Sequence, residues 1–167
     1  SFRDGSTDNL ASLPSGVVSL EGISFDIRGV IQLSGSPSTK QVRLDESGIR
    51  VRQSCRRIQF LHGTEGPSIA GTTIGWFQVH CLSGQKIDLP LRYGWDVSDS
   101  WCMATDPVQG QHVVRIEPSS VPSKLGKQLR LYLTTWSNPN PDDSIETIDF
   151  RSAAAGSAPF LVAVTLE

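Results

Sequence analysis

The chain has 167 residues, of which 38% are hydrophobic and 19% are charged, and its formal net charge is −2. This length fits one domain that can bury a substantial core. The near-neutral charge argues against nucleic acid as the main partner, because phosphate binding needs a clustered basic surface. No apolar run reaches the length of about 18 residues that a membrane-spanning helix needs, so we expect no membrane span.

The first half of the chain is expected to contain a lead-in segment, residues 1–16, and the start of a single domain over residues 17–167. In the strand expected at 23–33, Gly29 falls on the inward phase and indicates a bulge. A turn is expected at Glu46-Ser47-Gly48. Short alternating patterns predict strands at residues 17–20, 23–33, 42–44, 49–51 and 57–62.

The second half contains the clearest hairpin, over residues 72–82 and 85–91, joined by the favoured turn pair Ser83-Gly84. Pro90 lies on its outward phase, which predicts an edge strand. Leucines alternate with polar residues over 129–134 and predict a half-buried strand. A helical turn is expected at residues 99–104, and further strands at 112–117, 148–150 and 160–166, the last with Phe160, Val162, Val164 and Leu166 on one face.

No segment of a dozen residues has a helical period, and about nine short strands are separated by turn signals. This pattern predicts an all-β fold. The length and the strand pattern favour an antiparallel two-sheet β-sandwich of the jelly-roll type.

An aromatic loop over Tyr93–Trp101 suggests a ligand, because it packs three of the six Trp and Tyr residues into nine positions. A pyranose offers an apolar face and a rim of hydroxyls, so Trp95 and Trp101 are candidates for stacking. Arg92, Tyr93 and Asp96 are candidates for binding hydroxyls. The alternatives are that one Trp closes the end of the core and that Asp96 and Asp99 cap the following turn.

A second candidate lies at Trp136, which is in phase with polar residues at a strand end and is followed by Asn138 and Asn140. The alternative is that Pro139 and Pro141 pack against the Trp136 ring. His62 could line the rim of the same kind of pocket, or it could be a structural histidine inside the core.

Metal and redox chemistry have weaker signals. Asp4 and Asp8 lie in an oxygen-rich stretch and are candidates for a structural calcium, with a turn-forming lead-in as the alternative. We expect no other cofactor. Cys55, Cys81 and Cys102 are odd in number and lack metal-type spacing, so we expect buried thiols, or one bridge between two of them.

Several segments together resemble the galactose-binding-like β-sandwich modules, and most of all the bacterial NPCBM-like domains that are appended to glycoside hydrolases and to multidomain surface or regulatory proteins. The segments are 22–29 (GISFDIRG), 93–96 (YGWD), 145–152 (IETIDFRS) and 158–166 (APFLVAVTL). The resemblance implies a lectin-like accessory module that binds carbohydrate or polysaccharide through end loops or along a concave sheet, often with a structural calcium. It also implies neighbouring domains in a parent chain and favours a secreted or cell-surface location.

The sequence gives no positive ground for catalysis. It has no nucleophile elbow, phosphate-binding loop or dinucleotide fingerprint, so we expect no enzyme. The main expectation is therefore a non-catalytic carbohydrate-binding module of a larger bacterial protein. The alternatives are a structural or protein-interaction β-sandwich and, third, a hydrolase with an unrecognised site.

Overall fold

The computed structural model describes residues 10, 13–36, 43–103, 105–115 and 127–167. These residues contain no α-helix, and their strands pair antiparallel, which confirms the all-β sandwich. In chain order the strands are β1 (Gly16–Leu20), β2 (Ile23–Ile27), β3 (Ile31–Gln32), β4 (Asp45–Gln53), β5 (Arg57–Glu65), β6 (Thr73–Cys81), β7 (Lys86–Arg92), β8 (Trp101–Met103), β9 (Val113–Arg115), β10 (Lys127–Ser137), β11 (Ile145–Ser152) and β12 (Ala158–Leu166).

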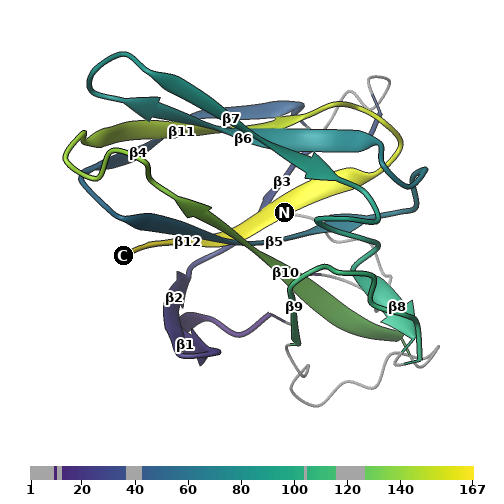
Figure 1. The fold of residues 1–167 in the computed structure, drawn as a ribbon. Coiled ribbons are helices and arrows are strands. Elements are labelled where there is room, and N and C mark those ends of the chain that lie inside the picture. The colour runs from purple at the N-terminus through teal and green to yellow at the C-terminus, as the bar shows by residue number, and fades with distance from the viewer. Residues whose placement is uncertain (1–9, 11–12, 37–42, 104, 116–126) are drawn as a thin grey trace.

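Two sheets lie face to face (Figure 1). The four-stranded sheet has the order β4-β11-β6-β7. The six-stranded sheet has the order β3-β12-β5-β10-β8, and β9 also pairs with β10. The hairpin of β1 and β2 lies below the six-stranded sheet in Figure 1. The six-stranded sheet is therefore covered on both faces, whereas no element in the described part of the chain covers the outer face of the four-stranded sheet.

Each face of the six-stranded sheet has its own core. The main core lies between the two sheets, where the Phe77 ring stacks on Phe60 at 4.2 Å and on Phe150 at 4.9 Å between ring centroids. The second core lies between the six-stranded sheet and the β1–β2 hairpin, and it contains Phe25 and Phe160. Burial of these apolar rings is the main stabilising contribution to the sandwich.

This double covering corrects the prediction of a half-buried strand at residues 129–134. In β10 the leucines face the second core, and Tyr132 on the opposite phase is buried in the main core. Arg130 is buried as well. Leucines and polar residues do point to opposite faces of β10, as predicted. The face with the polar residues, which was expected to meet water, packs against the four-stranded sheet instead.

Two further corrections concern positions at or beside glycines. The strand expected at 23–33 is broken after Ile27, so that Phe25 faces the second core and Leu33 the main core, and Gly29 lies in the break. The expected turn at 46–48 lies inside β4, where Ile49 pairs with residue 148 and Glu46 with residue 150. This extra residue is a bulge with Gly48 at a φ of 73°, which glycine adopts without strain.

The last strand also contains a bulge, between Leu161 and Ala163. The bulge inverts the phase, so Phe160 and Val162 face the second core while Val164 faces the main core. The expectation of one continuous face was therefore wrong. The helical turn expected at 99–104 was also wrong, because residues 101–103 form β8 and pair with β10. Residues 42, 116 and 117 of the predicted strands lie outside the described residues.

The predicted hairpin is confirmed as β6 and β7, with Gly84 in the turn at a φ of 92°. Pro90 lies on β7, which is an edge strand as expected. Within the described residues, no helix is long and apolar enough to cross a membrane.

Candidate functional site

The predicted aromatic loop is a compact turn that one carboxylate holds closed. Asp96 accepts hydrogen bonds from the backbone N–H of Arg92 at 2.8 Å and from its guanidinium Nε at 3.0 Å. The backbone N–H groups of Trp95 and Asp96 both donate to the Arg92 carbonyl. Gly94, at a φ of 81°, donates its N–H to the carbonyl of Val97. The loop is therefore rigid without any ligand.

Trp95 is the exposed ring of this loop, with 56% of its surface accessible. The Arg92 guanidinium lies over the indole, 4.9 Å from its centroid. This cation–π contact and the ion pair with Asp96 fix the guanidinium at one face of the ring. Arg92, Trp95 and Asp96 are thus three predicted binding residues that the structure brings together at the surface.

The rest of the loop serves the fold. Tyr93 is partly buried against the main core, and its hydroxyl accepts the N–H of Asp99 at 3.3 Å. Asp99 in turn accepts the N–H of Trp101, which agrees with the capping alternative. The buried Gln111 side chain donates to the Gly94 carbonyl at 2.6 Å and so ties the loop to the segment before β9.

The other two predicted stacking rings lie elsewhere. Trp101 pairs with Leu129 on β10 and packs on the second core, with its indole Nε1 buried and without a hydrogen-bond partner. Trp136 lies seven residues further along β10, roughly 23 Å away, and packs on the main core. The two rings also lie on opposite faces of the sheet. They cannot stack on the same sugar.

Asn138 and His62 have structural contacts. The Asn138 amide donates to the carbonyl of Cys55 at 3.0 Å and accepts the N–H of Asn140. His62 is fully buried and contacts the Thr134 hydroxyl through Nε2 at 2.8 Å, while Nδ1 has no partner. Burial lowers the pKa of His62 to about 4, although the charge of Asp96 opposes this shift. His62 is therefore the neutral structural histidine of the alternative interpretation.

The metal candidates Asp4 and Asp8 lie outside the described residues. Among the residues that are described, no group of three or more His, Cys, Asp or Glu side chains is arranged to hold a metal. Cys55, Cys81 and Cys102 are buried, and no disulfide joins any two of them. Burial raises the pKa of both Cys55 and Cys81, as expected for unreactive core thiols.

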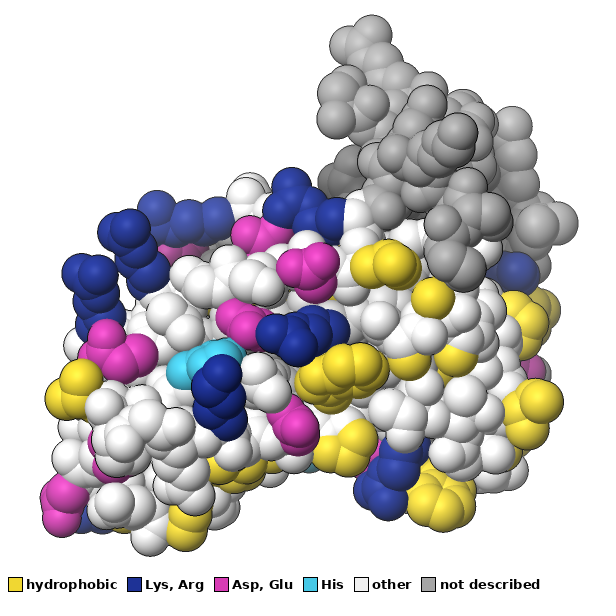
Figure 2. Space-filling view, turned by 90° about the horizontal axis from the view of Figure 1, so that it is seen from above, with side chains coloured by type: hydrophobic (Ala, Val, Ile, Leu, Met, Phe, Trp, Pro, Cys, Tyr) yellow, Lys and Arg dark blue, Asp and Glu magenta, His cyan; other side chains and the backbone are white. Residues whose placement is uncertain are grey.

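A second surface lies on the open outer face of the four-stranded sheet, where basic, acidic and hydrophobic side chains are interleaved (Figure 2). Asp149 on β11 is at its centre. This carboxylate accepts the N–H of Gly48 at 2.8 Å, and its other oxygen contacts His80 and Arg151, each at 3.0 Å. Its own burial opposes ionisation, but these hydrogen bonds outweigh burial and lower the pKa of Asp149.

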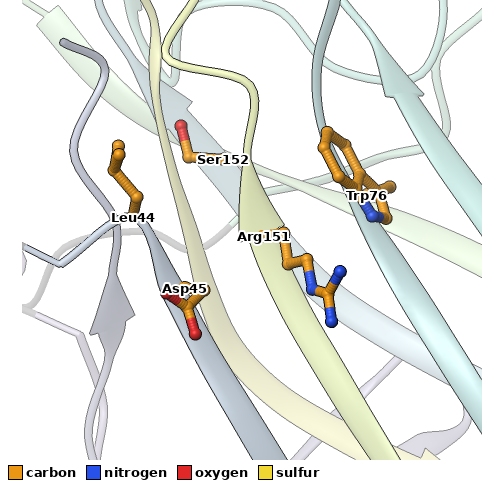
Figure 3. Close-up of a pocket in the computed structure, with 5 residues that line it drawn as sticks. All are labelled: Leu44, Asp45, Trp76, Arg151 and Ser152. Carbon is orange, nitrogen blue, oxygen red and sulfur yellow. The ribbon is translucent and has the colours of Figure 1, made fainter. Parts of the chain in front are cut away.

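Trp76 lies beside this network. It pairs with Arg151 on β11 and with Pro90 on β7, and Arg151 pairs with Asp45 on β4. One transverse row of side chains therefore crosses all four strands. A shallow depression of about 390 Å³ opens along the row, and Figure 3 shows the Arg151 side chain between those of Asp45 and Trp76. Its lining residues are Leu44, Asp45, Trp76, Arg151 and Ser152.

Trp76 was not among the residues that the sequence singled out. The signal was present, because the predicted inward phase of Phe77 and Val79 places Trp76 and His80 on the outward phase. A large ring on the outward phase of a strand is costly to expose and marks a candidate surface. The partners Asp45 and Arg151 had no such signal, since their approach to Trp76 depends on strand order.

The fold and this surface define a β-sandwich with aromatic and charged side chains on one open sheet face and on the adjoining loop. No protein-family model matches the chain, and no curated protein matches it. The resemblance to galactose-binding-like and NPCBM-like modules therefore remains an expectation from the sequence.

Proposed function

We propose that the protein is a non-catalytic carbohydrate-binding module, as the resemblance to NPCBM-like domains implies. The observation that carries the proposal is the exposed Trp95 ring, held in place by Arg92 and Asp96. A ring whose position is already fixed loses little conformational entropy when a ligand stacks on it. Stacking on a sugar then contributes on the order of 1–2 kcal/mol from apolar area.

The chemistry around Trp95 suits a sugar because it offers both donors and acceptors. Arg92 covers one face of the ring, and 56% of the Trp95 surface remains accessible to a pyranose. The Asp96 carboxylate is partly exposed and has lone pairs beyond those that Arg92 uses. Such mixed polar groups beside an aromatic face match the hydroxyl rim and the C–H face of a sugar.

The strand order supports the jelly-roll part of the proposal. The eight strands β3 to β7 and β10 to β12, renumbered 1 to 8, have the order 1-8-3-6 in one sheet and 2-7-4-5 in the other. Eight strands in two such interlocked sheets are typical of a jelly roll. A place beside other domains of a bacterial parent chain, outside the cell, belongs to the same proposal.

The test is affinity electrophoresis through gels that contain soluble polysaccharides. Native protein should be retarded in at least one gel, and the Trp95→Ala variant should lose most of that retardation. Weak affinity is expected, with a Kd of roughly 10 µM to 1 mM, because desolvation of polar groups offsets the stacking gain. Leu82→Ala is a matched control, since Leu82 is exposed in the β6–β7 turn. Absence of retardation across a broad panel would contradict the proposal.

One observation favours the alternative of a protein-interaction sandwich. Ile69 is 80% exposed on the loop that contacts Gly94, so an apolar side chain lies near Trp95. A protein partner would contact both side chains. Ile69→Ser would then weaken binding of that partner as much as Trp95→Ala does. A sugar would depend on Trp95 far more than on Ile69.

A further inference from the structure

We propose that the ligand is an extended, uncharged oligosaccharide chain that lies across the four-stranded sheet and contacts Trp76 as well as Trp95. This inference rests on the proposed function and assigns it a second ring and a ligand class. Its basis is the transverse row formed by Asp45, Arg151, Trp76 and Pro90, which strand pairing brings together.

The row is continuous with the aromatic loop. Pro90 and Arg92 are two residues apart on β7, so both side chains lie on the outer face, with the buried Leu91 between them on the inner face. A diagonal pair of this kind is about 7–8 Å apart, which places Arg92 within reach of Trp76. Arg92 in turn contacts the Trp95 ring. We name the set Asp45, Arg151, Trp76, Pro90, Arg92 and Trp95 the transverse strip.

The length of the strip favours a chain over a single sugar. Neighbouring strands are about 4.8 Å apart, so the part from β4 to β7 alone spans roughly 14 Å. The strip then continues past the edge of β7 to Trp95. Within the strip, Pro90 and Arg92 connect Trp76 to Trp95, so a chain of sugars is better matched to both rings than one pyranose is.

The polar groups of the strip are fixed before any ligand arrives. The Arg151 guanidinium is held by Asp149, which is itself held by the Gly48 N–H and by His80. Arg151 retains N–H groups beyond the one that Asp149 accepts, and its side chain is 39% exposed. Donors that are already oriented bind hydroxyls without a further ordering cost.

The charges of the strip favour an uncharged chain. Both cations are already paired, Arg151 with Asp149 and Arg92 with Asp96. Asp45 adds a further carboxylate, so three carboxylates face two guanidinium groups. An acidic polymer would meet no unpaired positive charge in the strip, whereas neutral hydroxyls can both donate to the carboxylates and accept from the guanidinium groups.

The experiment uses four neutral soluble polysaccharides, namely mixed-linkage β-glucan, arabinoxylan, galactomannan and dextran, with polygalacturonate as the acidic counterpart. For each polysaccharide that retards the native protein, calorimetry measures binding of its disaccharide and hexasaccharide. Trp76→Ala should weaken hexasaccharide binding about tenfold, since a buried ring face is lost, and should leave disaccharide binding unchanged. Trp95→Ala should weaken both. Trp76→Phe, which retains a smaller ring, should give an intermediate loss and guards against misfolding of the Ala variant.

The controls separate the two proposals. Leu82→Ala should bind like the native protein in every case. If the native protein binds and Trp76→Ala and Trp76→Phe both behave like Leu82→Ala, the strip is wrong and the loop site stands. If polygalacturonate binds more tightly than every neutral polysaccharide, the uncharged ligand class is wrong. If no polysaccharide binds, the proposed function itself fails, and the strip with it.

Discussion

The inner and outer sides of the four-stranded sheet place the same residue type in opposite environments, as His62 of β5 and His80 of β6 show. On the inner side, His62 is fully enclosed, neutral and in contact with the Phe77 ring edge, 5.8 Å between centroids. On the outer side, His80 is paired with the Asp149 carboxylate. His62 is thus kept neutral by burial inside the core, whereas the outer face organises charge around one carboxylate. The comparison shows that burial and strand order decide what each side chain does.

The largest effect should come from the inner face. Phe77 stacks between Phe60 and Phe150, so Phe77→Ala removes the middle ring and leaves a cavity. The free energy of unfolding should fall by about 3–5 kcal/mol, measured by urea denaturation. The control is Trp76→Ala on the adjacent outward position, which should cost far less. Equal losses for the two variants would contradict the assignment of inner and outer faces.

The next effect is a pH dependence from His62. Its pKa is about 4 in the folded state against about 6.5 in the unfolded chain, so the unfolded state takes up the proton first. Stability from this group is complete above pH 6.5 and is lost as the pH falls toward 4, by up to about 3 kcal/mol. His62→Gln, which can still bond Thr134, should flatten the unfolding free energy over this range. If the unfolding free energies of the variant and of the native protein changed in parallel with pH, His62 would have an ordinary pKa in the folded state.

The smallest effect belongs to the outer face. Asp149→Asn removes the charge that His80 and Arg151 share, and should cost about 1–2 kcal/mol at pH 7. Because the pKa of Asp149 is lowered on folding, this contribution is present above the ordinary aspartate pKa and is lost as the pH falls below about 4. Chemical unfolding of both proteins at pH 7 and at pH 3 checks this. The difference should shrink at pH 3, and a constant difference would exclude a charge effect.

Local patterns in the sequence were enough to predict the sheet class and the hairpin. The alternation in β6 and β7 and the edge position of Pro90 follow from residues close in sequence. Two of the errors arose where a single inserted residue changed the phase. Gly48 produces a bulge where a turn was expected, and the irregularity after Leu161 inverts the last strand. The alternation of apolar and polar residues along a strand does not reveal where one extra residue is inserted.

The candidate site was less accessible to prediction. The loop cluster of Arg92, Trp95 and Asp96 is local, and sequence proximity was sufficient to group it. Trp101 was grouped with it because it ends the same nine-residue stretch, and Trp136 was a second candidate, but the two rings lie far apart along β10. Trp76 and Arg151 are far apart in sequence and become neighbours only because β11 pairs with β6. Residue types alone contain no information about that pairing.

The four tryptophans allow the central claim to be tested in one measurement, because each indole N–H gives its own signal in a ¹H–¹⁵N NMR spectrum. The probe is the hexasaccharide of whichever neutral polysaccharide retards the native protein. Upon its addition, the signals of Trp76 and Trp95 should shift with the same saturation curve, and those of Trp101 and Trp136 should stay in place. Shifts confined to Trp101 and Trp136, or no shift in any of the four, would contradict binding along the transverse strip.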